Sequence, residues 1–266
     1  MLGVENQLTN SEPDSNTLQL RLARKTPIKE WQLADVVDVI VETPETSTLR
    51  LALPNPSSFI PGQYYNIRIP VEGRPRPIQR AYSIGSSPYP DFGIIEVGVK
   101  EMVGGLVSPV LVRDTPVGSK LEVRGPYGAF NWTEEMGGPL LLVAAGSGVV
   151  PFMSMIRYAK AKNLTQPMHL LFSSKSKEYV IYGDELNKLQ EETGWLKVTH
   201  TYTRDPKDPT ARFHRRIDKE MLQDLLEETS PKLGYLCGPP EMVELCEVAL
   251  RELGMEPGSV FSEKYD

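Results

Sequence analysis

The chain has 266 residues, enough for one large domain or two ordinary ones, and its 40% hydrophobic and 24% charged content is typical of a globular protein. The net charge of −6 argues against nucleic acid as the main partner. No apolar run reaches the roughly 18 residues that a membrane span needs, and the N-terminus lacks a signal-peptide pattern. Two cysteines are too few for an iron–sulfur cluster, and the three histidines lie far apart. We therefore expect a cytoplasmic protein without a metal site, and no feature predicts its oligomeric state.

The first half of the chain predicts a barrel. Residues 1–29 are polar and lack sustained periodicity, so we expect a mobile tail or a strap across a domain surface. Short strand candidates separated by turn formers then follow, at 31–42, 48–53, 64–69, 81–84, 94–99 and 120–123. About six short strands at this spacing indicate a closed antiparallel Greek-key β-barrel over residues 30–136, interrupted by one short helix from 106 to about 112.

A different pattern begins at Gly137-Gly138-Pro139, and we place the domain boundary there, with a second domain over 137–266. Strands are expected near 140–145, 168–173, 196–203, 233–237 and 259–262. Helices are expected near 151–162, 182–192, 217–228 and 240–253. Strands that alternate with helices predict an α/β, doubly wound, parallel five-stranded sheet, in which ligands bind at the carboxyl ends of the strands.

The stretch 140–151 is the most informative part of this second domain. Six apolar residues without alternation suit a strand buried on both faces, and Gly146 and Gly148 follow at once. Pro151 then opens a helical pattern. Strand, glycine turn and helix N-terminus bring backbone N–H groups close to a phosphate. Since Pro151 takes the last place of the full glycine fingerprint, a tight connection that binds nothing stays open at this point.

Four short motifs occur in order along the chain. Arg80-Ala81-Tyr82-Ser83 lies on a predicted barrel strand, and Gly105-Leu106-Val107-Ser108 opens the short helix. Gly146-Ser147-Gly148-x-x-Pro151 follows the first sheet strand, and Cys237-Gly238-Pro239-Pro240 follows the fourth. In this order and at these separations, residues 31 to 266 resemble the ferredoxin–NADP⁺ reductase superfamily of flavoproteins. The ending Glu263-Lys264-Tyr265 resembles the Glu-x-aromatic ending of several of its branches.

The resemblance implies a flavin site on the barrel, with FAD more common than FMN. Arg80 would contact the flavin phosphates, Tyr82 would pack on the isoalloxazine ring, and Ser83 would hydrogen-bond near its reactive nitrogen. Forked guanidinium–phosphate bonds and aromatic stacking give these roles a physical basis. Gly105 and Ser108 would meet the pyrophosphate at a helix N-terminus. The complete set expected at the flavin comprises Arg80, Ala81, Tyr82, Ser83, Val97, Gly104, Gly105, Leu106 and Ser108.

The resemblance also implies a site for NADPH or NADH on the sheet. Cys237 resembles the cysteine that lies beside the nicotinamide. Thr203-Arg204 resembles the Ser-Arg pair that holds the 2′-phosphate, which gives a slight preference for NADPH. Additional positive charge on neighbouring loops comes from Lys175, Arg212, Arg215 and Arg216. The complete set expected at the coenzyme comprises Gly146, Ser147, Gly148, Pro151, Thr203, Arg204, Cys237, Gly238, Pro239 and Tyr265.

The resemblance implies a catalytic role for Ser83, Cys237, Glu263 and Tyr265. In the branch that ends in Glu-x-Tyr, the tyrosine covers the flavin face where the nicotinamide must bind, although here Asp266 follows it. Glu263 could take part in proton delivery near Ser83.

The function implied is an NAD(P)H-dependent flavin oxidoreductase that passes single electrons to a separate acceptor. That acceptor would be a ferredoxin, a flavodoxin, an oxygenase component or a small oxidant. A plain NAD(P) dehydrogenase without flavin and a non-catalytic nucleotide-binding module are the alternatives. The first predicts a colourless protein, and the second predicts nucleotide affinity without turnover.

Overall fold

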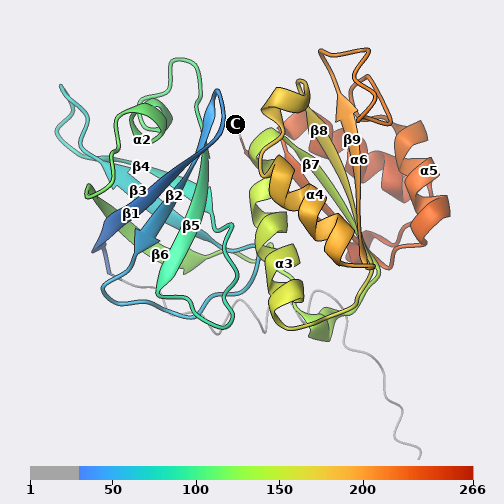
Figure 1. Ribbon diagram of the computed structural model, residues 1–266, viewed down its shortest axis with the longest axis horizontal. Helices are drawn as coiled ribbons and strands as arrows, with labels where there is room; N and C mark the ends of the chain where they lie inside the picture. Colours follow the sequence, from blue (N-terminus) through green and yellow to red (C-terminus); the bar gives the residue numbers. More distant parts are fainter. Residues whose placement is uncertain (1–29, 266) are drawn as a thin grey trace, which may run out of the picture.

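The computed structural model describes residues 30–265 and contains two β-sheets, each with its own hydrophobic core (Figure 1). The tail expected over residues 1–29 lies outside the described residues. The first sheet takes the strands up to Tyr127, and the second takes those from Leu140 onward. The domain boundary expected between 136 and 137 falls in the segment between them and stays a prediction. Among the described residues, no helix combines the length and apolar character of a membrane span.

The first sheet is antiparallel, with the strand order β4-β3-β6-β1-β2-β5. Its strands are β1 (Gln32–Thr43), β2 (Thr46–Ala52), β3 (Tyr64–Ile69), β4 (Ile78–Ser83), β5 (Ile94–Lys100) and β6 (Lys120–Tyr127). A bridge between Ile84 and Val97 joins the two ends of the sheet and closes the barrel, as the sequence predicts. The short helix α2 (Ser108–Arg113) begins two residues later than expected.

Alternation of side chains fills the barrel interior, because every second residue of a strand points to the same face. Tyr65 and Ile67 on β3 are fully buried, as are Leu49 on β2 and Val97 on β5. Strand β4 begins at Ile78 rather than at residue 81 because Gln79 and Arg80, although polar, pair with β3. The barrel core therefore holds β4 in place while its polar side chains remain outside the core.

The second sheet is parallel, with the order β11-β10-β7-β8-β9. Its strands are β7 (Leu140–Ala145), β8 (Met168–Ser174), β9 (Leu196–Tyr202), β10 (Leu233–Gly238) and β11 (Val260–Lys264). Its helices are α3 (Val150–Ala161), α4 (Gly183–Glu192), α5 (Lys219–Thr229) and α6 (Pro240–Glu252). The doubly wound five-stranded sheet predicted from the sequence is therefore confirmed, with element boundaries within about two residues of those expected.

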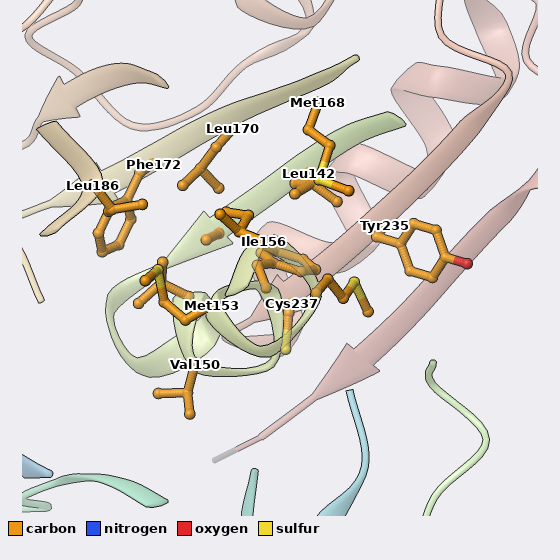
Figure 2. Close-up of a cluster of buried hydrophobic side chains, with 14 of the residues drawn as sticks. Leu142, Val150, Met153, Ile156, Met168, Leu170, Phe172, Leu186, Tyr235 and Cys237 are labelled. Atoms are coloured by element: carbon orange, nitrogen blue, oxygen red, sulfur yellow. The ribbon is translucent and has the colours of Figure 1, made fainter. Parts of the chain in front are cut away.

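The helices cover both faces of this sheet. Helices α3 and α4 pack on the face that carries Leu142 and Phe172, and α5 and α6 pack on the face that carries Leu141 and Leu236. Figure 2 shows the first layer, in which Met153 and Ile156 of α3 lie against the sheet. In Figure 1, α3 lies along the side of the sheet that is nearest the barrel. The carboxyl ends of the strands consequently open toward the barrel beside the start of α3.

Candidate functional site

A cleft of about 610 Å³ lies between the barrel and the carboxyl ends of the parallel strands. Strand β4, the segment before α2, the glycine turn after β7 and the end of the chain all contribute to its walls. The residues predicted from the sequence that line it are Arg80, Ala81, Tyr82, Ser83, Gly104, Gly105, Leu106, Ser108, Ser147, Glu263 and Tyr265. One cavity thus combines side chains from both sheets.

The β4 wall of the cleft presents a cation and an aromatic ring. The Arg80 side chain is exposed, and its Nη1 donates to the carbonyl oxygen of Gln79 at 2.8 Å. Burial raises the pKa of Tyr82 to about 12, so its phenol stays protonated at neutral pH. Across the cleft, Gly104 has φ +75 and open space where a side chain would stand. The two sides of the cleft together therefore offer a cation for phosphate, a ring for stacking and an unobstructed backbone turn.

Ser83 and Glu263 meet in this cleft although they come from different sheets. Ser83 ends β4, and Glu263 lies on β11, where the last strand of the chain reaches the barrel. The Ser83 hydroxyl hydrogen-bonds with the Glu263 carboxylate. Burial raises the pKa of Glu263 to about 7, and the hydrogen bond from Ser83 opposes this rise only in part. The carboxyl group can therefore gain or lose a proton near neutral pH.

Cys237 and Tyr265 meet at the end of β10. The thiol donates to the phenol oxygen at 3.3 Å, and the Tyr265 backbone N–H donates to the carbonyl oxygen of Gly238 at 3.3 Å. A hydrogen bond with Ser147 links the same phenol to the glycine turn. Burial raises the pKa of the Cys237 thiol, so it remains neutral. The aromatic ring is thus held at the carboxyl edge of the sheet, facing the β4 wall.

The turn after β7 forms a short 3₁₀ helix, Gly146–Val149, which leads directly into α3. Gly148 is buried there, and a Cβ at its position would stand 2.0 Å from the carbonyl oxygen of Cys237. Close packing against β10 therefore demands glycine at this position whatever ligand binds. Pro151 is buried in the first turn of α3, as its place in the sequence predicts.

Thr203 and Arg204 lie just beyond the carboxyl end of β9. The Thr203 backbone N–H donates to the carbonyl oxygen of Ser174 at 3.0 Å, and that of Arg204 donates to the carbonyl oxygen of Lys175 at 2.8 Å. Both side chains are exposed. Within residues 30–265, no acidic side chain pairs with the Arg204 guanidinium. The other arginines expected to add positive charge do form ion pairs, Arg212 with Asp224 and Glu228, Arg215 with Asp218 and Glu220, and Arg216 with Glu241. Lys175 pairs with Glu45, so among the basic residues that the sequence predicts for this edge, Arg204 is the one without an acidic partner within residues 30–265.

Comparison with known proteins decides the family. Residues 33–132 match the oxidoreductase FAD-binding domain, and residues 142–247 match the oxidoreductase NAD-binding domain. Ferredoxin–NADP reductase B of Sorangium cellulosum is 32% identical over 217 residues, which cover 78% of this chain and 86% of that protein. The chain belongs to the ferredoxin–NADP⁺ reductase superfamily.

Oxygenase systems supply other relatives in this superfamily. The ferredoxin–NAD(P)⁺ reductase component of naphthalene 1,2-dioxygenase/salicylate 5-hydroxylase systems from Ralstonia is 28% identical over 227 residues, which cover 84% of this chain and 65% of that one. The chain spans 60% to 67% of the length of four such oxygenase reductase components. Among solved structures, the cytochrome P450 reductase GcoB of Amycolatopsis superposes with a TM-score of 0.78 at 25% identity, covering 90% of this chain and 70% of that chain.

Two residues that line the cleft are not part of the four sequence motifs. Tyr64 faces Glu263 from β3, opposite Ser83 in the strand register, and Lys100 ends β5 with its ammonium group 3.0 Å from Glu45. Register with Ser83 could have indicated Tyr64, but Lys100 gives no comparable signal. Conversely, the Val97 side chain is fully buried in the barrel core and does not line the cleft. Val97 could therefore contact a flavin only through its backbone atoms.

Proposed function

We propose that this protein is an NAD(P)H-dependent flavin oxidoreductase that passes single electrons to a separate acceptor. The observation that carries the proposal is the meeting of Ser83, Glu263 and Tyr265 in one cleft, with Cys237 hydrogen-bonded to Tyr265 at its edge. These four groups come from both sheets and from distant parts of the chain. A plain dehydrogenase has no use for the β4 wall, and a binding module has no use for a titratable carboxyl group beside it.

The residues of the cleft fit FAD. Arg80 would hold the flavin phosphates, Tyr82 would stack on the ring system, and the open turn at Gly104 and Gly105 would admit the pyrophosphate. FAD, when bound, supplies the redox step, since its ring system accepts a hydride from the coenzyme and releases the two electrons one at a time.

Glu263 and Ser83 would handle the proton that accompanies hydride transfer. A carboxyl group with a pKa of about 7 is half protonated at neutral pH, which suits a group that both donates and accepts a proton. The Ser83 hydroxyl belongs to the β4 wall and is the partner of this carboxyl group there. It would pass the proton from the Glu263 carboxyl oxygen through its own Oγ.

Tyr265 would cover the position of the nicotinamide until the coenzyme arrives. The Gly146–Val149 turn would receive the pyrophosphate, and Arg204 would receive a 2′-phosphate. The neutral Cys237 thiol adds no charge beside the ring, so it would pack against the nicotinamide without opposing a hydride. Displacement of Tyr265 is then part of each turnover.

The acceptor would be a separate electron carrier or an oxygenase component. The reductase components of oxygenase systems among the relatives support this choice. Both cysteines of the chain are free thiols, which supports a reducing compartment such as the cytoplasm.

Reconstitution tests the flavin part of the proposal. Purified protein should be yellow, or apoprotein should become yellow with FAD and bind it more tightly than FMN. Ser83→Ala should leave FAD affinity within about threefold but slow reduction by coenzyme about 100-fold or more, the range for loss of a proton-transfer group. A colourless protein that neither FAD nor FMN reconstitutes would contradict the proposal and favour the dehydrogenase.

A further inference from the structure

Outside the cleft, the Tyr182 side chain of the parallel-sheet region packs against the outer face of the barrel. Tyr182 lies directly before α4 and is only 4% exposed. Its phenol oxygen lies 3.3 Å from Thr48 Oγ1 on β2, and its backbone N–H donates to the Glu42 carboxylate on β1 at 3.2 Å. Thr48 Oγ1 also donates to Glu42, at 2.8 Å. A phenol, a hydroxyl and a carboxylate thus connect α4 with the first two barrel strands.

Two glycines in the barrel make room for this side chain. A Cβ at Gly98 on β5 would stand 2.9 Å from the Tyr182 phenol oxygen and 2.5 Å from Val150 Cγ2. A Cβ at Gly85, two residues after Ser83, would stand 3.0 Å from the same phenol oxygen. Both distances are shorter than a normal contact. The Tyr182 phenol therefore occupies a space that a Cβ atom at either position would narrow, so both positions favour glycine.

Tyr182 also adopts a costly backbone conformation. Its φ of 59° and ψ of 25° place it in the left-handed region, which is unfavourable for a residue with a side chain. Glycine at this position would remove the cost but also the ring. The strained backbone is held by the contacts of the ring and of the backbone N–H with the barrel. Strain of this kind is typical of a residue whose placement serves the site rather than the helix.

Arg157 on α3 completes the link. Its guanidinium donates to Glu185 at 2.8 and 2.5 Å, to the carbonyl oxygen of Gly85 at 2.8 Å and to Glu96 on β5 at 2.7 Å. It also stacks 5.0 Å above the Tyr182 ring. One turn earlier on the same helix, Ser154 donates to the carbonyl oxygen of Ser86 at 2.7 Å. Helix α3 is therefore bonded directly to the residues that follow Ser83.

Helix α3 and strand β4 connect the two sides of the cleft through these contacts. The Gly146–Val149 turn runs straight into α3, and β4 runs through Ser83 to Gly85. We propose that Tyr182 and Arg157 are positioning residues, which set the distance between the flavin wall and the nucleotide turn. The inference rests on the proposed hydride transfer, because that reaction needs the reacting atoms of the two ring systems to lie about 3–3.5 Å apart.

Kinetics separates positioning from simple stability. In Tyr182→Ala, hydride transfer at saturating coenzyme should fall about tenfold to 100-fold, as expected for a misplacement near 1 Å. FAD affinity and the dissociation constant of the coenzyme should each stay within about threefold, since each ligand contacts mainly its own wall. Tyr182→Phe keeps the ring, so its rate of hydride transfer should fall less than that of Tyr182→Ala. Tyr158→Phe is the matched control, because its phenol bonds with Glu134 outside the barrel and should leave the rate unchanged.

A distance measurement supplies a readout that needs neither ligand. Spin labels at Val117→Cys and Lys188→Cys would lie on the barrel and on α4, at exposed positions, while Cys237 and Cys246 are buried. In apoprotein, Tyr182→Ala and Arg157→Lys should broaden or shift the interspin distance distribution, and Tyr158→Phe should not. An unchanged rate in Tyr182→Ala, or a lower rate with an unchanged distribution, overturns the inference. If the parent itself transfers no hydride, the proposed function fails, and the label distances alone decide whether the pair holds the two sheets in place.

Discussion

The Cys237 thiol lies 3.3 Å from the Tyr265 phenol oxygen, so the last described residue of the chain is tied to the end of a central sheet strand. Two further hydrogen bonds, to Ser147 and to the carbonyl oxygen of Gly238, hold the same residue. The ring is therefore an ordered part of the cleft wall. Under the proposed function, a nicotinamide ring would reach the flavin only by displacing it.

Removal of the Tyr265 ring should strengthen binding of oxidised coenzyme. In Tyr265→Ser, the coenzyme no longer competes with a bound side chain, so its dissociation constant should fall about tenfold or more. Turnover should slow because product release becomes limiting, and a charge-transfer band should appear. Titration of both proteins with NADP⁺ and NAD⁺ measures the effect. Equal constants in the variant and the parent would show that the ring does not occupy the nicotinamide position.

Glu263 makes stability depend on pH. Its folded-state pKa of about 7 lies above its ordinary value of 4.5, so folding favours the protonated carboxyl group. Its contribution to stability is full below about pH 4.5 and is lost as the pH rises through 7. Glu263→Gln cannot ionise. Its free energy of unfolding should therefore rise relative to that of the parent by up to about 3 kcal/mol between pH 5 and pH 9.

Urea unfolding of the two apoproteins across this range tests the expectation. Ser83→Ala removes the hydrogen bond that lowers the pKa of Glu263, so in that variant the loss of stability should again begin near pH 4.5 but continue to a higher pH than in the parent. A stability difference between Glu263→Gln and the parent that does not change with pH would contradict the assigned pKa.

The fold could be predicted largely from local patterns. Strands β3 and β7 match their expected ranges because alternation and unbroken apolar runs reveal burial directly. Strand β6 continues through Gly125 and Pro126 to Tyr127, four residues past the expected end, since the ladder with β3 resumes after a dipeptide that usually marks a turn.

The interdomain contacts had no such signal. An arginine within a helix and a tyrosine before one are ordinary in any sequence, so Arg157 and Tyr182 carry no motif. Their role depends on the space beside Gly85 and Gly98 on the outer face of the barrel, which the tertiary fold brings against α3 and α4. The pairing of Ser83 with Glu263 could be suggested by resemblance, but their distance depends on how the two sheets are joined.

Arg80 should matter for flavin affinity. Arg80→Ala removes a charge-assisted hydrogen bond worth about 1.5–3 kcal/mol, equivalent to roughly a 10- to 100-fold loss. Titration of apoprotein with FAD measures this loss. Arg68→Ala is a suitable control, because Arg68 is a barrel arginine that pairs with Glu122 at 2.6 Å and does not line the cleft. Equal affinity in Arg80→Ala and the parent would exclude the phosphate role.

Arg204 should govern the choice of coenzyme. Arg204→Ala should raise the KM for NADPH about tenfold or more and barely change NADH kinetics, because only NADPH carries the 2′-phosphate. Arg212→Ala should not discriminate between the coenzymes, since its guanidinium is already paired with Asp224 and Glu228. Equal losses with NADPH and NADH in Arg204→Ala would mean that this residue holds another part of the coenzyme.

We propose that one cleft brings coenzyme and flavin together for hydride transfer. Anaerobic titration of the FAD-loaded protein with NADPH and, separately, with NADH tests it most directly. We expect about one equivalent of the preferred coenzyme to bleach the visible flavin absorbance, and an added one-electron acceptor to restore it. Bound FAD that stays oxidised with an excess of both coenzymes would exclude the proposed hydride transfer.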